Sequence, residues 1–212
     1  MSSNENCKPP PTDPPKPVLW LITGSNGAGK TTFYYQRLKP RLNLPYVNAD
    51  EIARTRWPED PAAHAYDAMW AAARQRDAYL ENRQSFVAET VFSHPSKLAL
   101  IRDAQRRGYI VNVVFIYIAN DDLAVRRVDE RVLRGGHAVP AVKIRERYAR
   151  TLEHMRQAAQ IADQLLLFDN NEAGRPPRWV LSFSKGRIDD CIPEPPSWVQ
   201  SLFNHEWARS PR

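Results

Sequence analysis

Residues with chemically useful spacing gather first between positions 24 and 32. Gly24, Gly29, Lys30 and Thr31 have the spacing of a glycine-rich phosphate loop, and they stand between an apolar run and a helix-like segment. Backbone N–H groups of such a loop cradle a triphosphate at a helix N-terminus, while the lysine reaches the β- and γ-phosphates and the threonine hydroxyl takes a Mg²⁺ ligand position. Chance would place these four residues at this spacing in roughly one chain per hundred of this length. The predicted phosphate-binding residues are Gly24, Ser25, Asn26, Gly27, Ala28, Gly29, Lys30, Thr31 and Thr32, with Thr31 also the predicted metal ligand.

Two acidic residues follow short strand-like segments farther along the chain. Asp50 comes after the segment Pro45–Asn48, and Glu89 ends the segment Ser85–Glu89. Ligands of open parallel sheets bind outside the carboxyl ends of the strands, where the phosphate loop also lies. Asp50 is therefore expected to face the transferred phosphate, and Glu89 to orient a hydroxyl or hold a Mg²⁺-bound water. The alternatives are that Asp50 caps the helix Glu51–Arg56, which would not exclude catalysis, and that Glu89 pairs with a basic neighbour.

A basic region over residues 126–150 carries the third group of candidates. Arg127, Arg131 and Arg134 are spaced three or four apart, so they share one helical face, and a flexible glycine pair separates this helix from the next. Such a region predicts a lid that closes over phosphates and places guanidinium groups on the developing charge. The alternative is an exposed helical hairpin with solvated arginines. His137, next to the glycine pair, is a weaker candidate for the substrate side.

The elements that would position these residues alternate between strands and helices, which predicts an α/β three-layer sandwich with a mostly parallel sheet. The expected strands are Val18–Ile22, Pro45–Asn48, Ser85–Glu89, Tyr109–Ile118, Gln164–Phe168 and, at the sheet edge, Arg178–Ser184. The expected helices include Lys30–Leu38, Glu51–Arg56, a segment ended by Gly108, the two lid helices and Ser197–Trp207. Tyr109–Ile118 is the clearest central strand, and it ends without an aspartate. Asp50 or Glu89 must then serve the metal.

One long helix is expected over Pro61–Arg83, with Asp60 as its N-cap. Its apolar positions recur at helical spacing and predict a single buried face. The residues of that face are Tyr66, Met69, Ala73 and Leu80.

The whole chain has 212 residues and an ordinary composition, which predicts one domain over 18–212 after a disordered, proline-rich leader over 1–17. Cys7 and Cys191 lie far apart, which suggests neither a disulfide framework nor a metal cluster and fits a reducing cytoplasm. Neither a signal segment nor a membrane span is recognisable. The net charge of +6 favours anionic partners, namely nucleotides, nucleotide sugars, RNA or an acidic protein.

Four sequence blocks together resemble the zeta-toxin family of phosphate-loop kinases, specifically its shorter single-domain members. They are GSNGAGKTT from Gly24, VNADEIA from Val47, SFVAETVFSHP from Ser85, and RVDERVLRGGHAVP with the following IRERY from Arg127. Their order and spacing are far more specific than the phosphate loop alone. The resemblance covers about Val18–Asn170.

The resemblance implies an adenylate-kinase-like core with a helical lid that uses ATP and Mg²⁺ to phosphorylate a sugar hydroxyl of UDP-N-acetylglucosamine or a related UDP-sugar. Such kinases are toxins held silent by a small antitoxin protein. Asp50 matches the general base and Lys30 the phosphate ligand. Glu89, with its neighbour Thr90, falls on the substrate or metal side. The lid arginines match Arg127 and, next, Arg131 or Arg134.

Two other functions fit the residues: a kinase of another acceptor, such as a small molecule or an RNA end, and a nucleotide-gated binding protein. Asp50 argues against the second, because a switch needs no carboxylate opposite the γ-phosphate. An RNA kinase should show aromatic residues along a basic groove for base stacking. The sequence places no such groove, so a nucleic-acid partner is not expected.

Overall fold

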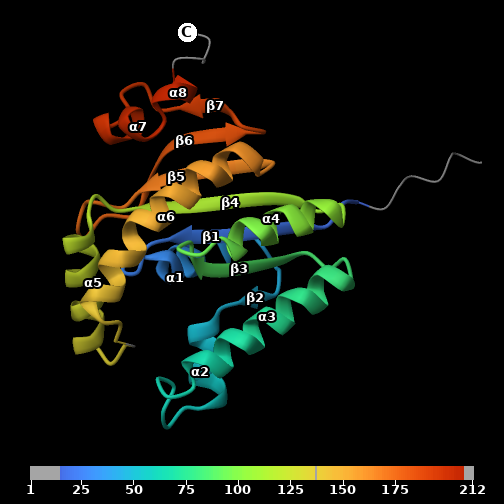
Figure 1. Ribbon diagram of the computed structural model, residues 1–212, viewed down its shortest axis with the longest axis vertical. Helices are drawn as coiled ribbons and strands as arrows, with labels where there is room; N and C mark the ends of the chain where they lie inside the picture. The colour runs from blue at the N-terminus through green and yellow to red at the C-terminus, as the bar shows by residue number, and fades with distance from the viewer. Residues whose placement is uncertain (1–14, 137, 208–212) are drawn as a thin grey trace, which may run out of the picture.

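The structure, a computed structural model, describes residues 15–136 and 138–207. Seven strands form one sheet in the order β2-β3-β1-β4-β5-β6-β7 (Figure 1). The strands are β1 (Val18–Gly24), β2 (Tyr46–Val47), β3 (Phe86–Val91), β4 (Ile110–Tyr117), β5 (Gln164–Asp169), β6 (Arg178–Ser184) and β7 (Arg187–Cys191). The five strands from β2 to β5 run parallel, and β6 and β7 are each antiparallel to the preceding strand. The expected mostly parallel α/β sheet is confirmed.

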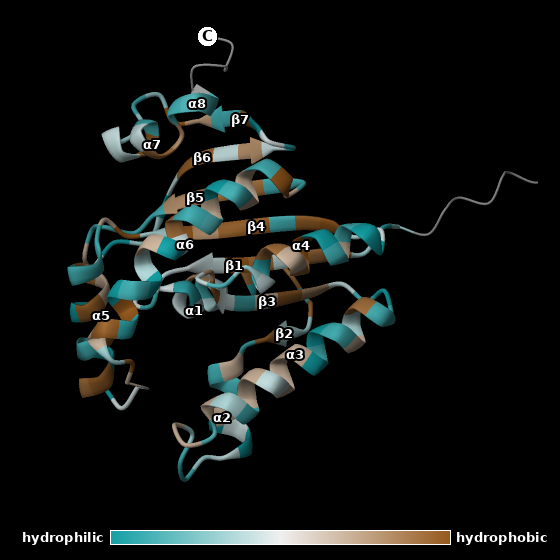
Figure 2. Cartoon of the chain, in the orientation of Figure 1, coloured by the Kyte–Doolittle hydropathy of each residue, from teal (hydrophilic) through white to brown (hydrophobic). Residues whose placement is uncertain are grey.

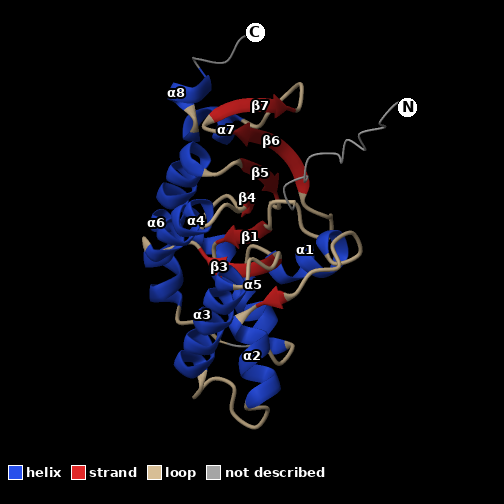
Figure 3. Cartoon of the chain, turned by 90° about the vertical axis from the view of Figure 1, so that its right-hand side faces the viewer, coloured by secondary structure: helices blue, strands red, loops and turns tan. Residues whose placement is uncertain are grey.

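Helices cover both faces of this sheet, which gives the expected three layers (Figure 3). The helical elements are α1 (Lys30–Phe33), the π-helical turn η1 (Tyr34–Leu38), α2 (Ala49–Arg56), α3 (Ala65–Glu81), α4 (Ser96–Arg106), α5 (Asp121–Leu133), α6 (Ala141–Ile161), α7 (Ser197–Leu202) and α8 (Asn204–Trp207). Side chains of α3, α4 and the second half of α6 pack on one face of the sheet. Those of α1 and α5 pack on the other. None of the helices in the described ranges is long and apolar enough to cross a membrane.

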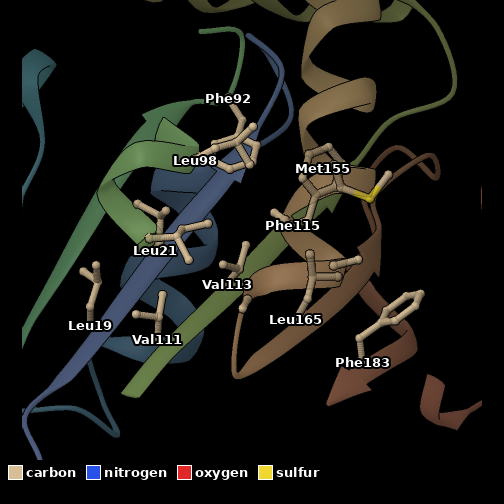
Figure 4. Packing of buried hydrophobic residues seen from close by; sticks show 14 of the residues in the cluster. Leu19, Leu21, Phe92, Leu98, Val111, Val113, Phe115, Met155, Leu165 and Phe183 are labelled. Carbon is tan, nitrogen blue, oxygen red and sulfur yellow. The ribbon is translucent and has the colours of Figure 1, made fainter. Parts of the chain in front are cut away.

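β4 is the central strand, as expected, and it is buried on both faces. Val111, Val113 and Phe115 join the larger core with α4 and α6 (Figure 4), whereas Val114 and Ile116 join the core under α5. A strand covered on both sides has no polar face, so it reads as a continuous apolar run. In Figure 2 the central strand β4 is mostly coloured hydrophobic, whereas much of the surface of the outer helices is coloured hydrophilic.

The sheet extends one strand beyond the expected edge. β6 was expected at the edge, but β7 pairs with it through a hairpin at Lys185 and Gly186, both of which have positive φ. Two residues of positive φ are typical of the two-residue turn that matches strand twist. β7 escaped detection because its sequence, RIDDC, is mostly polar and its side chains are largely exposed.

The long helix differs from expectation at its start and in its buried face. It begins at Ala65, four residues after Pro61, and the Asp60 carboxylate instead accepts the Ala63 N–H in the preceding turn. Tyr66 and Met69 point outward, with 73% and 45% of their surface exposed. The buried residues are Ala68, Ala71, Ala72 and Leu80. The prediction was right for Leu80 and wrong for Tyr66 and Met69, because close packing of the first half of α3 against α2 leaves room for small side chains only.

Candidate active site

The phosphate loop turns between β1 and α1 at the carboxyl end of the sheet. Gly29 precedes α1 with a φ of 89°, a left-handed conformation that favours glycine. A Cβ atom there would also lie 2.7 Å from the Asn170 side-chain nitrogen. That nitrogen donates a hydrogen bond of 2.8 Å to the Ala28 carbonyl. The loop after β5 therefore braces the phosphate loop, and this contact requires a glycine at position 29.

Lys30 lies across the loop with only 8% of its surface exposed. Its Nζ donates to the Ser25 carbonyl at 2.8 Å. Burial lowers the pKa of Lys30, the charges of Glu89 and Asp50 act in the opposite direction, and the charge of Arg131 adds to the lowering. The fold thus brings three other sequence candidates, Glu89, Asp50 and Arg131, within electrostatic reach of Lys30.

Glu89 is held by two hydroxyl donors. Thr31 Oγ1 donates to Glu89 Oε1 at 2.9 Å, and the Tyr46 hydroxyl donates to Glu89 Oε2 through a short hydrogen bond. Burial, followed by the charge of Glu89, raises the pKa of Tyr46, so the phenol remains a donor. Asn48 Nδ2 donates to the Tyr46 oxygen at 2.9 Å. Sequence reasoning missed Tyr46 and Asn48, although their i, i+2 spacing around β2 places both on one face of the strand.

These groups fit a magnesium ion of the kind that phosphate loops hold. The Thr31 hydroxyl donates a hydrogen bond to Glu89, so its oxygen lone pairs are left for a metal. Glu89 can accept hydrogen bonds from metal-bound water. Among the described residues no group of three or more His, Cys, Asp or Glu side chains could hold a metal by itself. This agrees with Mg²⁺ chemistry, in which water and phosphate oxygens supply most ligands.

Asp50 lies in the first turn of α2 and does not cap it. The cap is Asn48, whose Oδ1 accepts the N–H groups of Asp50 at 2.8 Å and Glu51 at 3.4 Å. The alternative role of Asp50 as the N-cap is therefore wrong, because Asn48 already occupies that position. The Asp50 carboxylate forms no hydrogen bond or ion pair with the described residues, and it borders a cavity of about 240 Å³.

Two arginines of α5 lie near the phosphate loop. A Cβ atom on Gly27 would lie 3.2 Å from Arg127 Cβ, and the half-buried Arg127 reaches the Asn171 carbonyl at 3.5 Å. Burial lowers the pKa of Arg127, which Glu130 partly opposes. Arg131 is close enough to Lys30 to influence its pKa. Arg134 is exposed at the end of α5, and its role stays a prediction.

Comparison with protein families gives a match to the family described as zeta toxin over residues 2–174. The chain belongs to the zeta-toxin family. A protein of Haemophilus influenzae, described as uncharacterized, is 25% identical over 137 residues, which cover 61% of this chain and 96% of that protein.

Solved structures share the fold of this zeta-toxin chain. A chain in the crystal structure of AvrRxo1-ORF1:-ORF2 with ATP aligns with a TM-score of 0.63 and 16% identity, over 82% of this chain and 60% of that chain. A structure of the PezAT chromosomal toxin-antitoxin system of Streptococcus pneumoniae aligns with a TM-score of 0.54 and 16% identity, over 76% of this chain and 71% of that chain. This chain thus spans less than two thirds of the AvrRxo1 chain. The expected phosphate-loop kinase fold is confirmed.

The connection between α5 and α6 begins with a defined helix cap. Gly135 N donates to the Val132 carbonyl and Gly136 N to the Arg131 carbonyl, both at 2.9 Å, which is the Schellman pattern. Gly135 has the positive φ of 80° that this pattern needs. The expected break between two helices is present, and the glycine pair also satisfies the last carbonyls of α5.

Thr90, a substrate-side candidate, is not brought into the Glu89 cluster. Thr90 follows Glu89 in β3, where successive side chains point to opposite faces, and its hydroxyl donates to the Val91 carbonyl at 3.3 Å. His137 lies outside the described residues. Their roles in substrate binding stay predictions.

Residues beyond the zeta-toxin match contribute to the phosphate loop indirectly. The Trp198 ring stacks on Tyr117 with centroids 3.6 Å apart, and its Nε1 donates to Asp169 Oδ2 at 3.1 Å. The other oxygen of Asp169 accepts the Asn171 N–H at 2.9 Å. Asn170, between them, makes the contact to Ala28 described above. The C-terminal segment therefore supports the loop that braces the phosphate loop.

Proposed function

We propose that this chain is a kinase that uses ATP and Mg²⁺ to phosphorylate a sugar hydroxyl of UDP-N-acetylglucosamine or a related UDP-sugar. The observation that carries the proposal is the unpaired carboxylate of Asp50, which borders a cavity and lies within electrostatic reach of the phosphate-loop lysine. A nucleotide-gated binding protein has no use for such a carboxylate. The choice of a UDP-sugar is supported by membership of the zeta-toxin family.

In this proposal Asp50 takes the proton of the acceptor hydroxyl as its oxygen attacks the γ-phosphorus of ATP. The new O–P bond forms while the bond from the γ-phosphorus to the β–γ bridging oxygen breaks, and ADP leaves with that oxygen. Lys30 holds the β- and γ-phosphates, and Arg127 and Arg131 stabilise the charge on the transferred group. Mg²⁺, when bound through Thr31 and water held by Glu89, neutralises phosphate charge.

The test uses the purified chain, labelled ATP and a panel of UDP-sugars, neutral sugars, nucleosides and RNA ends, followed by identification of the labelled product. We expect a phosphorylated UDP-sugar. Asp50→Asn keeps the shape of the side chain but removes the base, so transfer should fall at least 100-fold while ATP still binds. Lys30→Ala should also abolish transfer. Full activity of the Asp50→Asn variant would contradict the proposed role of Asp50 as the base. If RNA were the labelled product, the acceptor would be an RNA end and not a UDP-sugar.

We further propose that the kinase acts as a cytoplasmic toxin and that a small antitoxin protein silences it. Support comes from the family and from the PezAT structure, which is described as a toxin-antitoxin system. The net charge of +6 would favour an acidic partner by electrostatic steering. Induced expression in a bacterial host should arrest growth with the wild type and not with Lys30→Ala or Asp50→Asn. Harmless expression of an active wild type would refute the toxin role.

A further inference from the structure

The cavity beside Asp50 has walls made almost entirely of small side chains. It lies between α2, the turn that precedes α3, and the glycine pair that ends α5, whose positions relative to one another are visible in Figures 1 and 3. Ala53, Ala65 and Gly136 are typical of its lining, and the charged side chains among the described lining residues are Asp50 and Arg54. Among the described residues, these two side chains can therefore provide charged recognition in the cavity.

Asp50 and Arg54 are one helical turn apart on α2. Residues at i and i+4 share a helix face, with Cβ atoms roughly 5–6 Å apart. The pair does not form an ion pair with each other, and neither side chain has a hydrogen bond or ion pair with the described residues. Glu51, on the same helix, differs because it accepts the Tyr35 hydroxyl at 2.6 Å. Both groups lining the cavity are thus available to a ligand.

The size of the cavity limits what it holds. Its volume of about 240 Å³ corresponds to roughly eight water molecules and falls below the range of roughly 300–1,000 Å³ common for whole-ligand pockets. One sugar-sized ring fits this space, and the rest of a larger acceptor would lie outside.

We infer that this cavity holds the acceptor ring and that Arg54 binds an anionic group attached directly to that ring. This rests on the proposed function, in which Asp50 takes the proton of the acceptor hydroxyl. Asp50 and Arg54, one helical turn apart, can then contact a hydroxyl and a negative charge on the same acceptor. A sugar that carries a phosphate on its ring, free or as part of a nucleotide sugar, offers both groups. A neutral sugar or a nucleoside has no negative charge to bind the Arg54 guanidinium.

The experiment compares N-acetylglucosamine 1-phosphate and UDP-N-acetylglucosamine with neutral N-acetylglucosamine as acceptors. Binding is measured by calorimetry and phosphorylation by steady-state kinetics for wild type, Arg54→Gln, Arg54→Lys and Arg56→Gln. Arg56 is the matched control, because it is an exposed arginine of the same helix that does not line the cavity. Thermal unfolding verifies that each variant is folded.

For Arg54→Gln we expect Kd and KM for the anionic acceptors to rise roughly tenfold or more, as the loss of a charge-assisted hydrogen bond predicts. KM for ATP should change less than twofold, Arg54→Lys should recover part of the affinity, and Arg56→Gln should behave as wild type. Equal effects on neutral and anionic acceptors, a change confined to ATP, or no binding of any anionic sugar would overturn the inference. Phosphorylation of another acceptor class, with sugar phosphates still bound through Arg54, would instead refute the proposed function alone.

Discussion

Tyr46 shows how one hydroxyl can orient a carboxylate beside the phosphate loop. Its short hydrogen bond to Glu89, supported by Asn48, leaves the other oxygen of Glu89 for Thr31. Tyr46 also stacks on Tyr34 with ring centroids 3.6 Å apart, so its ring position is fixed by packing. Loss of the hydroxyl alone should therefore release Glu89 without moving the ring.

Tyr46→Phe is expected to lower kcat about tenfold and to raise the Mg²⁺ concentration needed for half-maximal activity, because Glu89 no longer holds metal-bound water in one orientation. The measurement is a Mg²⁺ titration of turnover at saturating ATP. Tyr109→Phe is the control, since that buried hydroxyl donates to the carbonyls of Tyr79 at 2.6 Å and Gln84 at 3.0 Å. If both variants show the same Mg²⁺ dependence, Tyr46 has only a structural role.

At the scale of elements, α5 presents different arginines to the phosphate loop and to solvent. Arg127 is half-buried next to Gly27, whereas Arg126 is exposed. Because α5 begins at an Asn120 cap and ends at the Schellman pattern, both ends of the helix are determined and its arginine face has one orientation. α5 thus has the features of a positioned arginine-bearing element.

Arg127→Ala should reduce kcat roughly 100-fold or more and change KM for ATP much less, because its charge is needed most in the transition state. Steady-state kinetics with varied ATP separate the two parameters. Arg126→Ala should retain wild-type kinetics. A loss confined to ATP affinity would instead assign Arg127 to ground-state nucleotide binding.

At the scale of the whole molecule, the segment beyond the family match is joined to the nucleotide site through Trp198. Its indole connects α7 to Asp169 and Tyr117 at the carboxyl ends of β5 and β4, and the next residue after Asp169 contacts the phosphate loop. The strands β6 and β7 thereby extend the sheet and also carry the chain to this support.

Trp198→Phe retains a ring to stack on Tyr117 but removes the N–H donor to Asp169. We expect the free energy of unfolding to fall by about 1 kcal/mol, the usual contribution of one hydrogen bond, and KM for ATP to rise several-fold as the supporting loop loosens. Trp179→Phe is the control, because that half-buried tryptophan of β6 makes no indole hydrogen bond with the described residues. Chemical denaturation and ATP kinetics provide the measurements. An unchanged KM for ATP would show that the Trp198 hydrogen bond stabilises the fold without supporting the nucleotide site.

The sequence by itself determined the features that depend on neighbours along the chain. The phosphate loop, the strand before it and the helix after it are contiguous, so residue type and spacing suffice to predict them. The positions of Asp50 and Glu89 near Lys30 also followed from sequence, because parallel strands place their carboxyl ends at one edge. Local glycines likewise located the end of α5, although only the structure showed the hydrogen bonds of the cap.

Only the tertiary structure decided contacts between residues far apart in the chain. Tyr46 meets Glu89 across 43 positions, and Trp198 meets Asp169 across 29, separations at which no local pattern reports a pairing. Tyr66 and Met69 were wrongly predicted on the buried face of α3 for the same reason, because the space left by α2 and the sheet fits alanine there. The role proposed for Arg54 depends on the cavity between α2 and the end of α5, which only the structure shows. Spacing and propensity determine which element forms, whereas the packing of elements determines which of its side chains meet.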